Sequence, residues 1–225
     1  MDFLSTSRQG NVLTVELKRP AQGNALNRQL QQELASTWQE LEDTDDLLVG
    51  VLTGSPDVFS IGHDREELLN GKGEAASTRA VEGLFPLNLS KPVIAAIEGP
   101  CYGLGFELAL SCDLRFVGEG AVLGMPDPNL FVSYRMASVL MPRMTYSGLT
   151  LQMLYAGRTL TPQEARGYRL VNQIAPKGQA LPAATAAAVA LAAKAAGSAD
   201  VFKKRLIWRL SSTPIPEAQA LVRTG

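Results

Sequence analysis

The sequence predicts an α/β fold in which right-handed ββα turns stack as a spiral and lead into an α-helical region. Segments that favour strands are interleaved with segments that favour helices over roughly the first 135 residues. Helical segments occupy most of the chain from about Met136 onward. The chain has 225 residues, of which 46% are hydrophobic, so it can bury a large core.

The first quarter of the chain predicts a strand, a helix and a second strand. Polar and apolar residues alternate over residues 11–17, which favours a half-buried strand. Asn27 is placed to cap a helix that runs to about Leu41. The second strand is predicted at residues 47–53. The apolar residues of the helix recur at helical spacing and are assigned to the core: Leu30, Leu34, Trp38 and Leu41.

The middle of the chain predicts a loop followed by alternating helices and strands. Residues 70–78 are polar and contain glycine, which indicates a loop before a helix that ends near Ser90. The apolar run at 92–97 predicts a strand, and a glycine turn separates it from a helix at 103–111. Two more short strands are predicted at 113–117 and 121–124.

Glu107 is the most informative residue, because it lies one turn inside a helix that opens with glycine. The first turn of a helix has unpaired backbone N–H groups and the positive end of the helix dipole, which suit an oxyanion. Asp127 follows Met125 and Pro126 in a second loop. Two carboxylates and two aimed N–H groups suit proton transfer beside a thioester carbonyl.

Composition and charge limit the classes of partner and cofactor. Lysine and arginine number 21 against 22 aspartate and glutamate residues, and 21 − 22 = −1, so nothing indicates a nucleic acid or an anionic membrane. No metal-ligand cluster or nucleotide fingerprint is found. Neither a basic leader followed by an apolar segment nor an 18-residue apolar span is found, so a cytoplasmic location is expected. Cys101 and Cys112 are expected to be reduced core residues.

Several segments resemble the enoyl-CoA hydratase/isomerase (crotonase) superfamily. They fall in the order and spacing of that family between about residues 10 and 175. The segments are 19–26 (RPAQGNAL), 51–54 (VLTG), 59–64 (FSIGHD), 92–99 (PVIAAIEG), 102–109 (YGLGFELA), 111–115 (SCDLR), 123–127 (LGMPD), 157–165 (GRTLTPQEA) and 170–171 (LV).

The resemblance implies a crotonase-like ββα spiral core with a C-terminal helical region. Residues 1–175 would form the core with the CoA and acyl sites, and residues 176–225 a shortened helical region. Trimers, often paired into hexamers, are usual in the family, so a homo-oligomer is expected. The shorter helical region implies an open acyl pocket, another assembly or a loss of catalysis. A basic cluster at residues 203–205 is either solvated or meets CoA phosphates.

The resemblance also implies the groups that bind the thioester. Its two oxyanion donors fall on the backbone N–H groups of His63 and Leu104. Ile61, Gly62, His63 and Asp64 match the loop that binds CoA through main-chain groups. The His63 ring would either line the CoA channel or take part in proton transfer, and Asp64 would either cap the next helix or act in the chemistry. The Leu104 side chain is expected to narrow the acyl pocket.

Glu107 and Asp127 fall where hydratases of the family keep two catalytic glutamates, which together activate one water. Asp127 is shorter than glutamate by one methylene, or about 1.5 Å, and a misplacement of about 1 Å can cost on the order of a hundredfold in rate. Asp127 is therefore either catalytic or a turn residue of the sequence Met-Pro-Asp-Pro. An isomerase would need only Glu107.

Residues 129–136 (NLFVSYRM) replace a glycine-rich stretch of the family. Phe131, Tyr134 and Arg135 are assigned to the acyl pocket, which would be restricted or would accept an acyl group that has its own carboxylate. Alternatively, these residues repack the core and a subunit contact.

The leading hypothesis is an acyl-CoA enzyme of the hydratase/isomerase type, a lyase or isomerase of fatty acid metabolism. Its substrate is an acyl-CoA thioester, and coenzyme A enters only as part of that substrate. One alternative is a hydrolase, decarboxylase or C–C bond enzyme that acts on an unusual CoA ester. Another is a non-catalytic or RNA-associated protein that uses the fold for assembly.

Overall fold

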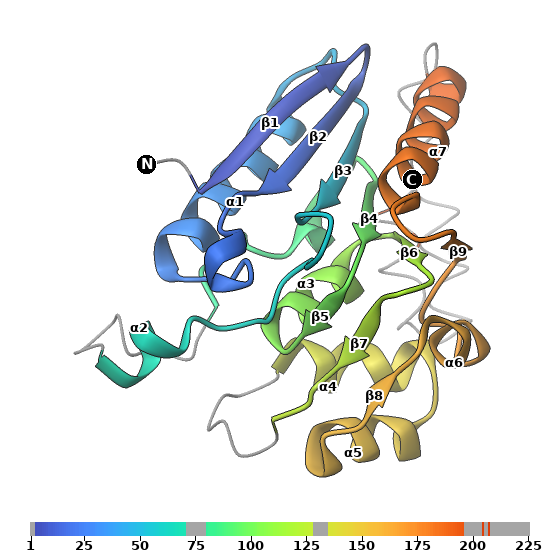
Figure 1. The fold of residues 1–225 in the computed structure, drawn as a ribbon. Coiled ribbons are helices and arrows are strands. Elements are labelled where there is room, and N and C mark those ends of the chain that lie inside the picture. Colours follow the sequence, from blue (N-terminus) through green and yellow to red (C-terminus); the bar gives the residue numbers. More distant parts are fainter. Residues whose placement is uncertain (1–2, 71–79, 128–134, 196–203, 205–206, 208–225) are drawn as a thin grey trace, which may run out of the picture.

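The computed structural model describes residues 3–70, 80–127, 135–195, 204 and 207 (Figure 1). Within them lie a six-stranded sheet, ordered β1-β2-β3-β4-β6-β9, and a three-stranded sheet, ordered β5-β7-β8. The strands are β1 (Leu4–Gln9), β2 (Val12–Leu17), β3 (Val49–Thr53), β4 (Val93–Ile97), β5 (Pro100–Tyr102), β6 (Leu114–Gly118), β7 (Val122–Gly124), β8 (Thr159–Leu160) and β9 (Gln173–Ala175). The α-helices are α1 (Arg28–Asp43), α2 (Arg65–Asn70), α3 (Leu104–Ser111), α4 (Arg135–Met144), α5 (Ser147–Ala156), α6 (Pro162–Gly167) and α7 (Ala180–Ala195).

The larger sheet is parallel except for the β1–β2 hairpin, and helices cover both of its faces. Strands β3 and β4 are buried along their whole length, as expected when a parallel sheet is covered on both sides. Alternate residues point to opposite faces: Val51 and Ile94 pack toward α7, whereas Leu52 and Val93 belong to the main core with α1 and α3. Figure 1 shows α7 on one side of this sheet and α1 and α3 on the other.

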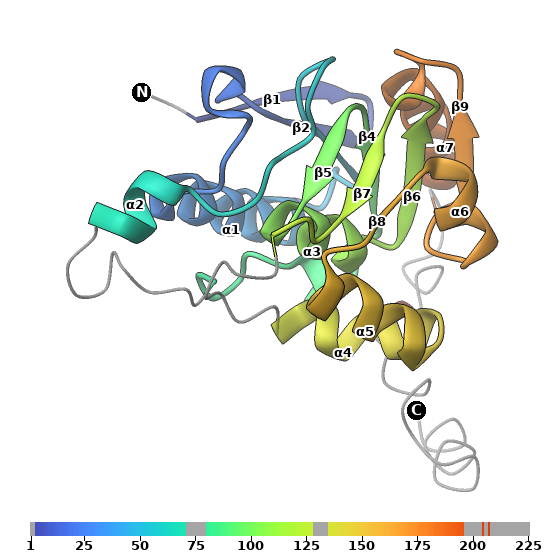
Figure 2. The same ribbon diagram turned by 60° about the horizontal axis from the view of Figure 1, so that its bottom comes forward.

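Helix α7 approaches the sheet closely because its inner face is made of alanine. Four of its five buried residues recur every four positions, at Ala180, Ala184, Ala188 and Ala192, and they pack against the strands through side chains of one carbon. Helix α7 is therefore a packing helix that covers one face of the sheet. On the opposite side of the molecule, α4 and α5 lie next to each other beneath α3 (Figure 2).

Several predicted elements are confirmed. The Asn27 side chain accepts a hydrogen bond from the Leu30 N–H at 2.9 Å, and α1 begins at Arg28, directly after Asn27. Helix α3 occupies the range predicted after the glycine turn, and the predicted strands correspond to β2, β3, β4, β6 and β7. Cys101 and Cys112 are free and buried.

The predicted helix ending near Ser90 is wrong. Among the described residues 80–90, the only helix is a 3₁₀ turn at Pro86–Asn88. Gly83 has a φ of 82°, and Pro86 cannot donate a backbone hydrogen bond, so an α-helix cannot continue through this segment.

Lys204 is not part of a solvated basic surface. Its side chain is 5% exposed and its ammonium lies 2.8 Å from Asp113. It also donates to the carbonyl oxygens of Pro86 and Lys91. Lys204 is therefore a buried anchor rather than a phosphate ligand, whereas residues 203 and 205 lie outside the described residues.

In the described part of the chain, no helix combines the length and apolar character needed to cross a membrane.

Candidate functional site

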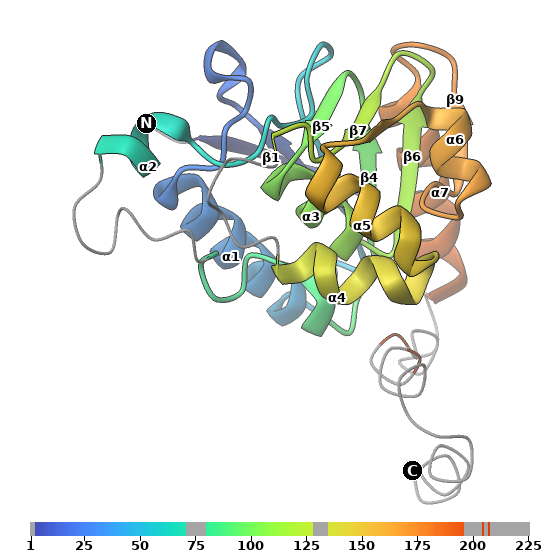
Figure 3. The ribbon, with the colours of Figure 1, turned by 90° about the horizontal axis from the view of Figure 1, so that it is seen from below.

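Three loops meet around a cavity of about 310 Å³. The first joins β3 to α2, the second is the turn between β5 and α3, and the third follows β7. Figure 3 shows α2, which borders the cavity, at the opposite end of the molecule from α7. The lining residues are Ile61, His63, Arg65, Tyr102, Gly103, Pro126 and Asp127.

The folded chain brings three of the residues that the resemblance assigned to the thioester site to the lining of this cavity. Ile61, His63 and Asp127 all line the cavity, and Gly103 is the residue before Leu104. Glu107 is not among the lining residues. Phe131 and Tyr134 lie outside the described residues, and only the backbone of Arg135 is described, so the acyl-pocket assignment remains a prediction.

The direction of the His63 N–H follows from the contact made by the preceding carbonyl. The Gly62 C=O accepts a hydrogen bond from the Leu26 N–H at 2.7 Å. In a planar trans peptide the C=O and the next N–H point to opposite sides. The His63 N–H therefore points away from Leu26. The His63 side chain is 7% exposed.

The Leu104 N–H is directed by the same principle. The Gly103 C=O accepts from the Glu107 N–H at 3.0 Å and so points along the helix. The Leu104 N–H consequently points out of the N-terminus of α3, where no carbonyl of the helix can accept from it.

Gly62 leaves open the space in front of this N–H. Its φ is 98°, a conformation that glycine adopts readily. A Cβ atom at this position would lie 3.0 Å from the Leu104 nitrogen and 2.8 Å from the Tyr102 oxygen. The two segments that hold the His63 and Leu104 N–H groups are thus in direct contact, and only glycine fits between them.

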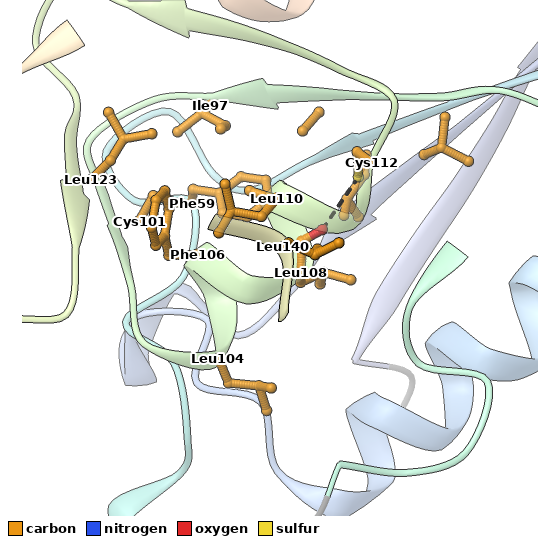
Figure 4. Close-up of a cluster of buried hydrophobic side chains, with 14 of the residues drawn as sticks. Phe59, Ile97, Cys101, Leu104, Phe106, Leu108, Leu110, Cys112, Leu123 and Leu140 are labelled. Atoms are coloured by element: carbon orange, nitrogen blue, oxygen red, sulfur yellow. Dashed lines mark hydrogen bonds between the residues drawn. The ribbon is translucent and has the colours of Figure 1, made fainter. Parts of the chain in front are cut away.

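The Leu104 side chain points into the protein. It is 1% exposed and belongs to the main hydrophobic core with Phe106 and Leu108 (Figure 4). It is not among the residues that line the cavity. The expectation that it narrows the pocket therefore finds no support in the described cavity, because the core takes up this side chain.

Glu107 is a buried carboxyl group held by the start of another helix. It is 2% exposed, and its Oε1 accepts from the Ala137 N–H of α4 at 2.9 Å. Burial raises its pKa to about 7, and hydrogen bonds from the backbone N–H groups of Ala137 and Met136 oppose this rise. A carboxyl group with a pKa near neutrality can both accept and donate a proton.

Asp127 forms an ion pair with Arg65, the first residue of α2. The two side chains are 37% and 63% exposed, and both residues line the cavity. The pair joins the loop after β7 to the helix that follows His63. Sequence reasoning missed Arg65, because the two partners are 62 positions apart and no local pattern relates them.

Asp64 has a structural position beside the cavity. Its carboxylate pairs with Arg19 at 2.9 Å, and both side chains are nearly buried. It also accepts from the Glu67 N–H at 3.2 Å, which confirms the predicted cap of α2. Asp64 therefore fixes the end of the loop that contains Gly62 and His63.

The comparisons with known proteins agree with this geometry. The family model described as Enoyl-CoA hydratase/isomerase matches residues 7–222. YngF of Bacillus subtilis (strain 168), a protein provisionally named an enoyl-CoA hydratase/isomerase, is 32% identical over 85% of this chain and 76% of its own length.

Two further proteins extend the likeness over nearly the whole chain. Carnitinyl-CoA dehydratase of Escherichia coli (strain K12) is 29% identical over 100% of this chain and 87% of its own. The crystal structure of an enoyl-CoA hydratase from Polaromonas sp. JS666 covers 98% of this chain and 89% of its own, with a TM-score of 0.88 and 27% identity. The chain belongs to the enoyl-CoA hydratase/isomerase family, and its fold is the crotonase fold.

Proposed function

We propose that this chain is an acyl-CoA enzyme that stabilises a thioester enolate between the N–H groups of His63 and Leu104. Glu107 transfers protons to and from the acyl chain. The observation that carries the proposal is that Glu107 lies one turn after Leu104 in α3 and has a pKa of about 7. A single rigid helix therefore sets the base relative to one oxyanion donor.

The proton balance is simple for an isomerase. The ionised Glu107 takes a proton from the α-carbon of a 3-enoyl-CoA, and the electron pair moves into the thioester carbonyl. The two N–H groups stabilise the resulting oxyanion, and losing one such donor costs about 3–4 kcal/mol in known cases. Glu107 then returns the proton to the γ-carbon. CoA is held by the loop Ile61–Gly62–His63–Asp64 as part of the substrate.

Hydration requires a second group that takes a proton from water. Asp127 lines the cavity and is paired with the cation of Arg65, an arrangement that restricts the orientation of its side chain. The E. coli relative is named a dehydratase, and dehydration is the reverse of this step. We therefore assign hydration to Glu107 and Asp127 together and proton exchange at the α-carbon to Glu107.

The test compares two readouts for the wild type, Glu107→Gln and Asp127→Asn. The first is loss of enoyl absorbance from crotonyl-CoA, which reports hydration. The second is deuterium incorporation at the α-carbon of butyryl-CoA in D₂O, which reports enolate formation. We expect Glu107→Gln to abolish both and Asp127→Asn to abolish only hydration. Exchange that survives in Glu107→Gln would refute the proposal.

Arg65→Met tests whether Arg65 orients Asp127 for hydration. If Arg65 orients Asp127, this variant loses hydration about as strongly as Asp127→Asn and keeps α-carbon exchange. Arg65→Lys keeps the charge but not the planar guanidinium, so it should be intermediate. Hydration that is equal in Arg65→Met and the wild type would remove Arg65 from the proposal.

We also propose a homo-oligomer. Helices α4 and α5 and the turn between them expose four large apolar side chains: Val139, Tyr146, Leu151 and Tyr155. Such groups are typical of contacts between subunits. Sedimentation velocity should give a mass above that of one chain, and Leu151→Glu with Tyr155→Glu should reduce it.

A further inference from the structure

Ser60 is a fully buried residue that lies directly behind the loop containing His63. Its hydroxyl donates to the Asn24 C=O at 2.8 Å and accepts from the Gly62 N–H at 3.1 Å. One hydroxyl group thus ties the inner side of the loop to a fixed point of the core.

This tether acts on the residue that directs the His63 N–H. The Gly62 C=O is held by the Leu26 N–H, and the Gly62 N–H is held by Ser60. Glycine has few steric restraints of its own, so these two hydrogen bonds restrain the peptides on both sides of Gly62, whose φ is 98°. Without the Ser60 hydroxyl, the peptide plane before Gly62 can rotate, and the following plane, which contains the His63 N–H, can rotate with it.

The backbone of Ser60 also holds the second N–H donor. Its N–H donates to the Pro100 C=O at 3.1 Å, and its C=O accepts from the Tyr102 N–H at 2.8 Å. Tyr102 is two residues before Leu104. These contacts connect the loop after β3 with the turn into α3.

The first turn of α3 also rests on the Ser60 side chain. A Cβ atom on Gly105 would lie 2.6 Å from the Ser60 Cβ and 2.7 Å from its Oγ. The absence of a side chain at Gly105 therefore lets the helix sit against Ser60. Since Leu104 is the adjacent residue, Ser60 contacts both segments that present N–H groups to the cavity.

We propose that Ser60 is a positioning residue that sets the angle and spacing between the His63 and Leu104 N–H groups. The inference rests on the proposed function, in which these groups bind the thioester oxygen. Ser60 contacts no substrate atom itself. It acts by holding the Gly62 peptide, and a displacement of about 1 Å in such a site can cost on the order of a hundredfold in rate.

Ser60→Ala is the test, and Ser111→Ala is its matched control. Ser111 is also fully buried, lies at the other end of α3, and donates its hydroxyl to the Leu108 C=O at 2.6 Å. Both variants remove one buried hydroxyl that is bonded to backbone. Only Ser60→Ala frees a peptide beside the cavity.

Two readouts separate positioning from a general loss of stability. The first is the carbonyl stretching band of bound [1-¹³C]crotonyl-CoA, which moves to lower frequency when N–H groups polarise the C=O bond. The second is amide hydrogen exchange of residues 60–64 in the ligand-free protein. We expect Ser60→Ala to reduce the carbonyl shift, to raise exchange at Gly62 and to lower kcat about 10- to 100-fold with KM within about twofold. Ser111→Ala should match the wild type in all of them.

The outcomes distinguish a failure of the proposed function from a failure of the role assigned to Ser60. If the wild-type protein binds crotonyl-CoA without a carbonyl shift, or does not bind it, the proposed function fails and the role of Ser60 fails with it. If the wild type shows the shift and Ser60→Ala shows the same shift and kcat, the proposed function stands and the inference about Ser60 is overturned. An equal loss in Ser60→Ala and Ser111→Ala also overturns it.

Discussion

The protonation of Glu107 can be tested through the pH dependence of stability. Burial raises its pKa from the usual 4.5 to about 7. Converted at about 1.36 kcal/mol per pH unit, the difference between these values is about 3 kcal/mol. Between these pH values the folded state keeps the proton and the unfolded state releases it. The free energy of unfolding therefore falls as pH rises through this window, and the contribution is lost above about pH 7.

Glu107→Gln removes this titration, and the amide oxygen can still accept from the Ala137 N–H. Urea unfolding of both proteins at about pH 5 and about pH 8.5 isolates the contribution of Glu107, because the two proteins share every other titratable group. The free energy of unfolding of the wild type minus that of Glu107→Gln should be about 2–3 kcal/mol smaller at about pH 8.5 than at about pH 5. A difference that does not change with pH would refute the reasoning, since it would mean that burial does not raise this pKa.

The same pKa predicts the pH profile of catalysis. If Glu107 acts as the base, kcat/KM should rise with pH along an acid limb whose apparent pKa is about 7 and then level off. An acid limb near 4.5 would contradict the burial effect.

Two further substitutions follow from the geometry. Gly62→Ala places a Cβ atom 3.0 Å from the Leu104 nitrogen at a φ of 98°. Crotonyl-CoA turnover should therefore fall about 100-fold. Gly178→Ala is the control that has the backbone strain alone, because Gly178 has a φ of 78° and a Cβ atom there would meet no atom within 4 Å. If both glycine variants lose turnover equally, crowding of the N–H is not the cause. Lys204→Met leaves the Asp113 carboxylate, which is 18% exposed, without its cation, so urea unfolding should show a loss of about 3 kcal/mol. A loss below about 1 kcal/mol would mean that this pair behaves like a surface ion pair.

Much of the fold could be predicted because its signals are local. The cap at Asn27, the buried run that became β4 and the glycine turn before α3 each depend on neighbours within a few residues. The family segments placed Glu107 on the first turn of that helix. These features follow from hydrogen-bonding geometry and hydrophobic periodicity, which a sequence shows directly.

Other elements could not be predicted, because they form only by pairing. Strand β1 is polar and mostly exposed, and it exists as the antiparallel partner of β2. Strands β5, β8 and β9 have only two or three residues, too few to show a periodicity. Their neighbours in the sheets supply the hydrogen bonds that define them.

The sequence by itself determined the fold family, the positions of the carboxylates and the backbone groups expected to bind the thioester. Only the tertiary structure decided their environments: Glu107 is buried against the N-terminus of α4, Asp127 is paired with Arg65, and Lys204 is an internal anchor. The physical reason is that a pKa, an ion pair or the direction of an N–H depends on the atoms that surround a group in space. Those atoms come from segments that are 30, 62 and more positions away along the chain.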